Sequence, residues 1–265
     1  MPMDLAQAQE ASDLLVRLWR EGAAVESLPA EIRPASRLEG YAIQAQLERL
    51  SAKPLWGWKI AATSEAGQRH IGVGGPIAGR LLAEMVYHDG AEVPFGANRM
   101  RVAEAEFAFR MGRSLLPRRK PYSTEEVLDS VAALHTALEV PDSRFADFVT
   151  AGAAQLIADN ACAHQFILGP EAPAYWRKMN LDQHHIIGKV AGRYERDGYG
   201  RNVLGDPRIA LTWLANELSQ HGITLAAGQV VTTGTCVVPL EIQPGDEVFA
   251  DYGKLGVVRL RFTPN

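Results

Sequence analysis

Apolar residues near the start of the chain recur with the period of a helix. Leu14, Leu15, Leu18 and Trp19 are separated by three or four positions, which places them on one helix face. Gly22 follows at the point where such a helix ends, since glycine readily adopts the left-handed conformation of a C-cap. The pattern therefore predicts an amphipathic first helix.

A second helix is expected to begin after Ser36. Ser36 with Glu39 three residues later forms the pattern of a capping box. Ile43 and Leu47 continue an apolar stripe, and Pro54 ends the segment. Residues 1–55 are therefore expected to form a helical N-terminal segment.

From residue 56 onward the pattern changes to short β-like runs separated by turn signals. A helix start is expected at Thr63-Ser64-Glu65, and the glycines from Gly72 to Gly79 predict a long irregular loop. The expected strands cover residues 56–60, 101–111, 137–140, 185–194, 229–233, 246–250 and 256–262.

Two helices are expected to interrupt these strands, one from Ser123 to about Leu138 and one from Pro207 to Gln220. Turns are expected at Arg196-Asp197-Gly198 and at residues 243–246. Residues 56–265 then form one β-rich domain behind the helical segment, which is an α+β fold.

Composition and charge narrow the classes of function. The 265 residues are 47% hydrophobic and 22% charged, which is close to the globular average. A net charge of −4 gives no global electrostatic reason to bind nucleic acid or an anionic membrane. Without a signal-like start or a run of about 18 apolar residues, a cytoplasmic location is expected. Cys162 and Cys236 lie in apolar surroundings and are expected to be buried, reduced thiols.

The pair Glu104 and Glu106 is the strongest local candidate for chemistry. On a strand, alternate residues share one face, so the two carboxylates would lie side by side. Like charges this close raise one pKa unless a cation joins them, and Mg²⁺ accepts such oxygens. The alternative is a solvated edge strand with both glutamates facing water.

Other polar residues in apolar runs carry similar alternatives. Glu139 stands between Leu138 and Val140, and either faces water or needs a partner in the interior. Lys59 lies in an aromatic strand and is either a surface residue or a fixed positive charge for an anionic substrate. Residues 232–235 read Thr-Thr-Gly-Thr at a strand end, which suits carboxylate binding or an ordinary turn.

Several tempting features carry less weight. His184-His185 has no third metal ligand nearby in sequence, and Arg118-Arg119-Lys120 is typical of a solvated loop. The glycines after residue 71 lack both the P-loop Lys-Ser/Thr and the dinucleotide-binding spacing. No Gly-x-Ser-x-Gly elbow supports a serine hydrolase.

Taken in order, the motifs resemble a known family. They are WGWKIAATS from residue 56, ExE from 104, ALEVPD from 137, ADNA from 158, VLGDP from 203, WLANEL from 213 and TGT from 233. This series, spread over residues 36–262, resembles the 2-hydroxypenta-2,4-dienoate hydratase (2-oxopent-4-enoate hydratase) branch of the fumarylacetoacetate hydrolase superfamily.

The resemblance implies a mixed β-roll catalytic domain and an active site. Glu104, Glu106 and Glu139 match the family's metal ligands, with Mg²⁺ or Mn²⁺ as the expected ion. Lys59 matches the active-site lysine, and Thr233 and Thr235 match positions near the substrate carboxylate. The resemblance also implies a homo-oligomer, often a pentamer or decamer in the hydratases.

One departure from the family pattern concerns the substrate. Relatives commonly read Gly-Val-Asp-x-Pro-Asp after the lysine, whereas Gly74 and Ile77 stand at the two acidic positions here. An apolar Ile77 cannot transfer a proton, but it adds an apolar wall to the substrate pocket. We therefore expect a preference for a bulkier or less polar 2-oxo acid.

These observations lead to a hypothesis of metal-dependent hydration of a 2-hydroxy-2,4-dienoate in aromatic catabolism. Three alternatives remain: decarboxylation of a 2-oxo-3-enedioate of the 4-oxalocrotonate type, hydrolysis of an acylpyruvate, and a non-catalytic partner in an oligomer. The expected partners are a small anionic 2-oxo or 2-hydroxy acid, further copies of the chain and a pathway enzyme.

Overall fold

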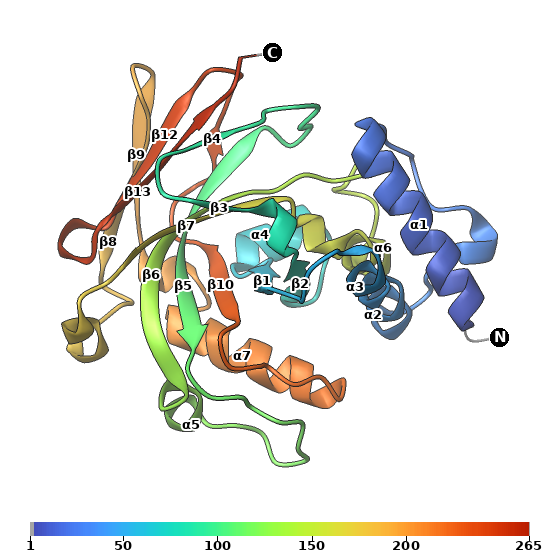
Figure 1. Cartoon of the computed structure of the whole chain (residues 1–265), viewed down its shortest axis with the longest axis horizontal. Coiled ribbons are helices and arrows are strands. Elements are labelled where there is room, and N and C mark those ends of the chain that lie inside the picture. Colours follow the sequence, from blue (N-terminus) through green and yellow to red (C-terminus); the bar gives the residue numbers. More distant parts are fainter. Residues whose placement is uncertain (1–2, 265) are drawn as a thin grey trace.

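Two β-sheets fill one side of the molecule and a group of helices covers the other (Figure 1). The computed structural model describes residues 3–264. The helices are α1 (Leu5–Glu21), α2 (Arg37–Ala45), α3 (Leu47–Leu50), α4 (Glu65–His70), α5 (Thr124–Leu128), α6 (Ala153–Ala158) and α7 (Pro207–Gln220). The strands are β1 (Gly57–Ala61), β2 (Ile77–Leu81), β3 (Val86–His88), β4 (Ala91–Val93), β5 (Val102–Met111), β6 (Val131–Val140), β7 (Gln165–Glu171), β8 (His185–Val190), β9 (Tyr194–Tyr199), β10 (Val230–Thr235), β11 (Leu240–Glu241), β12 (Glu247–Asp251) and β13 (Val257–Phe262).

The larger sheet has the strand order β2-β1-β10-β5-β6-β7-β3, with β11 added alongside β5. It is mixed, because β1 and β10 run parallel while β5 pairs antiparallel with both β10 and β6. The smaller sheet has the order β4-β13-β12-β8-β9. The expected α+β architecture with a mixed β-rich part is therefore confirmed.

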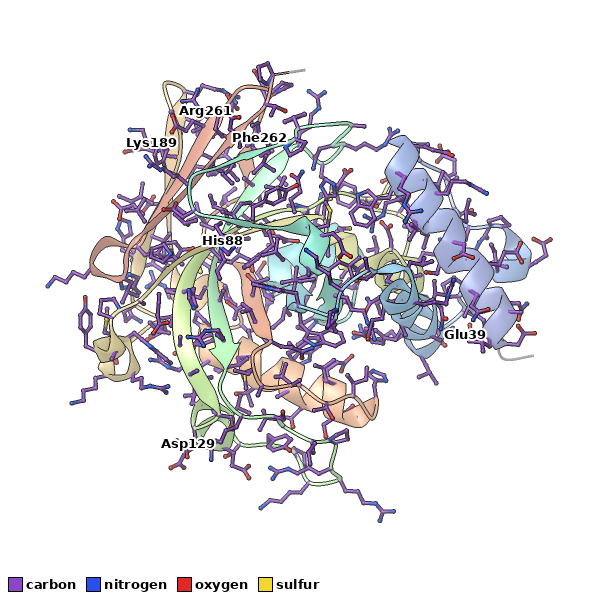
Figure 2. All side chains as sticks on the ribbon, viewed as in Figure 1. Glu39, His88, Asp129, Lys189, Arg261 and Phe262 are labelled. Carbon is purple, nitrogen blue, oxygen red and sulfur yellow. The ribbon has the colours of Figure 1, made fainter. Side chains whose placement is uncertain are left out.

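The smaller sheet packs against the larger one through alternating side chains. Along β13 alternate residues are exposed and buried, so Arg261 faces water while Phe262 enters the core (Figure 2). Tyr252, which follows β12, is fully buried and donates its hydroxyl to the carbonyls of Glu106 and Ala137. This contact ties the smaller sheet to the middle strands of the larger one.

The N-terminal helices follow the sequence expectation with one difference in capping. Ser36 accepts a hydrogen bond from the Glu39 N–H, as expected of an N-cap. The Glu39 carboxylate, however, accepts from the N–H groups of Met3 and Ala35 instead of closing a capping box. Helix α2 packs on α6, which lies far along the chain, and the division of the chain at residue 55 stays a prediction.

The prediction of a helix from Ser123 to about Leu138 is wrong beyond the first turns. Helix α5 begins with the expected Ser123 cap but ends at Leu128, and residues 131–140 form strand β6. This strand lies between β5 and β7, so its backbone groups are paired on both sides. Sheet pairing at the centre of the fold has overridden the local helical spacing.

Two glycines that predict loops or turns lie inside strands instead. Gly79 belongs to β2, which begins at Ile77, and Gly198 belongs to β9, so no turn forms at 196–198. A Cβ atom would lie 2.3 Å from the Asn160 carbonyl oxygen at position 79 and 2.0 Å from the Cys236 carbonyl oxygen at position 198. These glycines permit close backbone approach. The expected strand 185–194 is split into β8 and β9.

Other expectations agree with the structure. Helix α7 covers residues 207–220 as expected, and Ser64 caps α4. Cys162 and Cys236 are buried and free. Arg118 lies on the surface, where it pairs with Glu126. Within residues 3–264, no helix combines the length and apolarity that crossing a membrane requires.

Candidate active site

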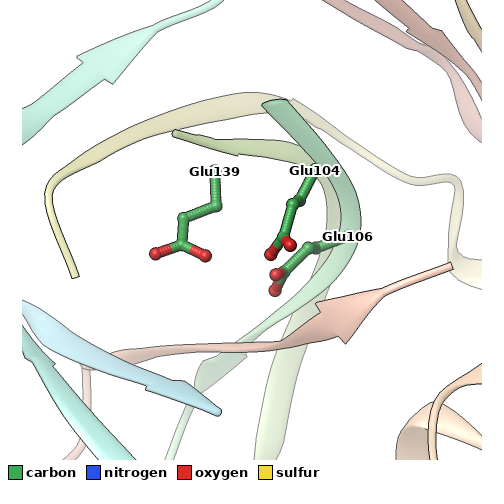
Figure 3. Close-up of side chains that lie close together, drawn as sticks. All are labelled: Glu104, Glu106 and Glu139. Atoms are coloured by element: carbon green, nitrogen blue, oxygen red, sulfur yellow. The ribbon is translucent and has the colours of Figure 1, made fainter. Parts of the chain in front are cut away.

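Three glutamate side chains converge on one face of the two long central strands. Glu104 and Glu106 project from β5 and Glu139 from β6, and their carboxylates turn toward one another (Figure 3). Each offers an oxygen within 4.8 Å of the others, and Glu104 stands directly opposite Glu139 in the strand register. Like charges in this position repel. The arrangement therefore requires a positive charge, and the expectation that Glu104 and Glu106 share one face is confirmed.

The glutamates lie in the interior with acceptor oxygens unused. Glu106 and Glu139 are fully buried. Within the described chain, Oε1 of Glu106 and Oε2 of Glu139 have no hydrogen-bond partner, and the one polar neighbour of Glu139 Oε1 is a lysine ammonium. Burying carboxylate oxygens without partners is costly. These open positions fit a hard divalent cation, which takes carboxylate oxygens as ligands.

The remaining oxygen of Glu106 is held by strand β10. Its Oε2 accepts from the Thr232 hydroxyl and, at 2.7 Å, from the Gly234 N–H. Gly234 has φ +100°, and a Cβ there would lie 2.1 Å from the Thr63 hydroxyl oxygen. From the sequence, residues 232–235 were compatible with binding of a substrate carboxylate or with an ordinary turn; in the structure, part of this segment binds the carboxylate of Glu106 instead. Sequence reasoning missed the supporting roles of Thr232 and Gly234.

The two threonines expected near the substrate lie in different places. Thr235 lines a cavity beside the glutamates. Thr233 is fully buried, is not part of the cavity wall, and donates its hydroxyl to the Phe107 carbonyl at 3.1 Å. The Thr233 hydroxyl is not placed to contact a substrate, because it donates its hydrogen bond to strand β5.

Lys59 is the cation among the carboxylates. It is 3% exposed, which excludes the surface alternative, and its Nζ lies 3.0 Å from Oε1 of Glu139. Nζ also donates to the Ala161 carbonyl at 3.1 Å. Burial lowers the pKa of Lys59, but the charges of Glu139, Glu104 and Glu106 outweigh burial and leave the pKa above its usual value. Lys59 is therefore a fixed positive charge.

A strained loop brings the Ala161 carbonyl to Lys59. Asn160, Ala161 and Cys162 all have positive φ, of 56°, 51° and 59°, a conformation costing about 1–2 kcal/mol per residue. The Asn160 side chain offsets this cost by pairing with both backbone groups of Arg80, at 2.6 and 2.8 Å. Strain held by specific contacts is typical of functional sites.

A second set of contacts fixes the start of this loop. Asp159 is buried and accepts hydrogen bonds from Ser143 and Arg144, and it forms an ion pair with Arg144. Burial raises the pKa of Asp159, and the charge of Arg144 opposes that shift. Residues 158–161, one of the motifs that resemble the family, are thus the segment that positions the Ala161 carbonyl against Lys59.

Without a bound ion, the net charge of the site is negative. Three ionised glutamates and one lysine give −3 + 1 = −2. Burial, and then the charge of Glu104, raise the pKa of Glu106 to about 7. Burial likewise raises the pKa of Glu104 and of Glu139. One divalent cation would bring the net charge to zero, so the residues present fit such an ion.

A cavity of about 580 Å³ opens over this cluster. Lys59 and Glu104 form part of its wall, while Glu106 and Glu139 lie behind it. Ile77, the first residue of β2, is 1% exposed and also lines the cavity. The expected apolar wall at position 77 therefore exists. His184 lies elsewhere, beside a separate surface pocket, and contacts the Tyr252 carbonyl.

Comparison with known proteins identifies relatives over most of the chain. The family model described as fumarylacetoacetate (FAA) hydrolase C-terminal matches residues 80–263. The chain is 32% identical to a 2-keto-4-pentenoate hydratase of Burkholderia vietnamiensis over 84% of this chain and 85% of that protein. It is 31% identical to a 2-oxo-hept-4-ene-1,7-dioate hydratase of Escherichia coli over 84% and 86%, respectively.

A solved structure has the same fold. It is the 4-oxalocrotonate decarboxylase of Pseudomonas putida G7, complexed with magnesium and adipate. The TM-score is 0.89 at 24% identity, and the match covers 98% of both chains. This likeness confirms the fold class expected from the sequence.

Proposed function

Because the chain belongs to the fumarylacetoacetate hydrolase family, we propose that it is a divalent-metal-dependent hydratase of 2-hydroxy-2,4-dienoates in aromatic catabolism. The observation that carries the proposal is the cluster of Glu104, Glu106 and Glu139, with unpartnered buried oxygens beside one buried lysine. Two relatives named as hydratases, at 31–32% identity, support hydration.

Glu104, Glu106 and Glu139 would hold the ion, and we propose Mg²⁺ or Mn²⁺. The magnesium complex of the P. putida decarboxylase supports this choice of a hard cation. When bound, the ion supplies a Lewis acid for the carboxylate and 2-oxygen of the substrate. The Thr232 hydroxyl and the Gly234 N–H keep the Glu106 carboxylate oriented toward it.

The reaction adds one water to the conjugated acid. A proton first moves from the 2-hydroxyl to the far carbon of the diene, which gives a 2-oxo-3-enoate. Water then adds across the C3–C4 double bond, with hydroxyl on C4 and the proton on C3. Lys59 Nζ stabilises negative charge on the substrate oxygens, since it is a preorganised donor in a water-poor site. Thr235 lines the cavity and would lie near the acid group of the substrate, while its hydroxyl donates to the Val237 carbonyl.

Three further properties complete the proposal. The protein acts on a small anionic acid in the cytoplasm. It forms a homo-oligomer, which is the assembly implied by the family resemblance. It acts beside a pathway enzyme that supplies the dienol.

Product analysis tests the proposal directly. The purified protein is incubated with Mg²⁺ or Mn²⁺ and, separately, with a 2-hydroxy-2,4-dienoate, a 4-oxalocrotonate and an acylpyruvate. We expect metal-dependent loss of dienol absorbance and formation of a 4-hydroxy-2-oxo acid. Release of CO₂ from the oxalocrotonate alone would identify a decarboxylase, and cleavage of the acylpyruvate alone would identify a hydrolase. Either result contradicts hydration.

A further inference from the structure

We propose that the substrate of this protein carries an uncharged, apolar tail longer than the five-carbon dienoate, and that the cavity disfavours dioates. This inference rests on the proposed hydratase function and specifies its substrate class. It is carried by the chemistry of the cavity wall beyond the carboxylate cluster.

The wall away from Lys59 and Glu104 is predominantly apolar. It is formed largely by side chains of Ile71, Ile77, Met100, Val102, Phe148 and Val237. Val238, which is 65% exposed, extends this apolar surface to solvent. An alkyl tail that leaves water for this surface gains binding free energy with each CH₂ that is buried. Binding to this wall is therefore expected to strengthen as the alkyl tail becomes longer.

Among the described residues, no second lysine or arginine lines the cavity to meet a distal carboxylate. Within residues 3–264, Lys59 is the one lysine or arginine on the cavity wall, and it already contacts Glu139 and Ala161. A carboxylate placed on an apolar wall without a positive partner pays a large desolvation cost. The nearby glutamate cluster would also repel it. A dioate is therefore disfavoured at its second acid group.

The arginines that neighbour the wall in sequence are engaged elsewhere. Arg69 pairs with Glu65 at 3.4 Å. Arg101 stacks over Phe95, with 5.6 Å from the guanidinium carbon to the ring centre. Arg201, next to Asn202 of the wall, lies over the Tyr199 ring, with 4.0 Å from the guanidinium carbon to the ring centre. Arg37, which donates to the Pro76 carbonyl, pairs with Glu217 at 3.1 Å.

His70 is the remaining basic side chain on the wall, and its ring contacts an apolar residue there. Its ring meets Phe148 edge to face, with 6.1 Å between ring centres. This contact joins helix α4 to the loop before α6 and extends the apolar surface. The imidazole is exposed to solvent and packs against Phe148.

The size of the cavity supports the same conclusion. Cavities of about 300–1,000 Å³ ordinarily hold drug-sized ligands. At about 580 Å³, this cavity exceeds the needs of a five-carbon acid with its ion and one water. The surplus space is lined by the apolar residues described above. A tail of three or more carbons on C5 would occupy it.

A three-substrate comparison tests the inference. The kcat/KM values are measured with Mg²⁺ from loss of dienol absorbance for 2-hydroxypenta-2,4-dienoate, 2-hydroxyocta-2,4-dienoate and 2-hydroxyhepta-2,4-diene-1,7-dioate. We expect the octadienoate to exceed each of the others by about tenfold or more. A dioate or pentadienoate that equals or exceeds it overturns the inference while leaving hydration intact. Turnover of none of the three removes the proposed function itself.

Substitutions on the wall provide the matched control. Phe148→Lys places a cation on the cavity wall, whereas Val149→Lys places one in the same loop off the wall. The first should shift the preference toward the dioate by about tenfold, and the second should leave the ratio unchanged. Val238→Lys, at an exposed position, repeats the test if Phe148→Lys fails to fold. Equal ratios in wild type, Phe148→Lys and Val238→Lys would contradict the inference.

Discussion

Gly234 connects the fold of strand β10 to the geometry of the carboxylate cluster, and Gly234→Ala tests that connection. The glycine has φ +100° and donates its N–H to Glu106 Oε2 at 2.7 Å. An added Cβ would lie 2.1 Å from the hydroxyl oxygen of Thr63 and 2.7 Å from its methyl carbon. The chain at Gly234 or Thr63 must therefore move, and the N–H moves with it.

The expected loss of unfolding free energy in Gly234→Ala has two separate contributions. Placing a side chain in a positive-φ conformation costs about 1–2 kcal/mol. Overpacking a buried site costs about 1–3 kcal/mol more. Gly228→Ala is the matched control. Gly228 also has a positive φ, of +85°, and lies just before β10, but a Cβ added there would have no atom within 4 Å. We expect Gly234→Ala to lose about 1–3 kcal/mol more unfolding free energy than Gly228→Ala.

The assay measures both stability and metal affinity. Denaturant unfolding gives the free energy of each variant, and Mn²⁺ titration gives the affinity of the cluster. Gly234→Ala should weaken Mn²⁺ binding because Glu106 loses a charged hydrogen bond, and Gly228→Ala should leave it unchanged. Equal losses of stability in the two variants, or unchanged Mn²⁺ affinity in Gly234→Ala, would show that Gly234 does not support the carboxylate cluster.

Three further predictions concern residues around the cluster. Lys59→Met should lower kcat by about 10²-fold or more while metal still binds, as measured by steady-state kinetics beside Mn²⁺ titration; full activity would exclude Lys59 as a charge donor. Asn160→Ala should lose about 1–3 kcal/mol of unfolding free energy, because the left-handed loop that presents Ala161 loses its two bonds to Arg80; an unchanged denaturation midpoint would contradict this. Burial lowers the pKa of His164 to about 3, so the unfolded chain binds the extra proton below about pH 6.5 and stability should fall as the pH decreases, by about 1 kcal/mol at pH 5.5; the pH dependence of unfolding should flatten in His164→Gln.

The sequence predicted those parts of the structure that depend on local pattern. The Ser123 and Ser64 caps, helix α7 and strand β5 carry strong local signals, and the structure contains them. The pairing of Glu104 and Glu106 followed from strand periodicity alone. Glu139 and Lys59 needed the family resemblance, because a single charged residue in an apolar run does not reveal its partner.

Features that depend on contacts distant in sequence were missed. Val127, Val131, Leu134 and Leu138 have helical spacing, but strand pairing on both sides decides the conformation of β6. The left-handed loop at 160–162 contains no glycine, so only its contacts reveal it. Likewise, Thr232 and Thr233 look equivalent in sequence, and only the register of β10 separates the one that contacts Glu106 from the one that contacts Phe107.

We expect Glu104, Glu106 and Glu139 to bind one divalent cation together, and a Mn²⁺ titration at pH 8 measures this binding. Glu106→Gln and Glu139→Gln are compared with wild type and with Glu171→Gln, whose carboxylate forms a surface pair with Arg110. We expect one ion per chain, bound at least tenfold more weakly in the two cluster variants and with unchanged affinity in Glu171→Gln. Absence of a bound ion in the wild type, or equal affinity in all four proteins, would contradict it.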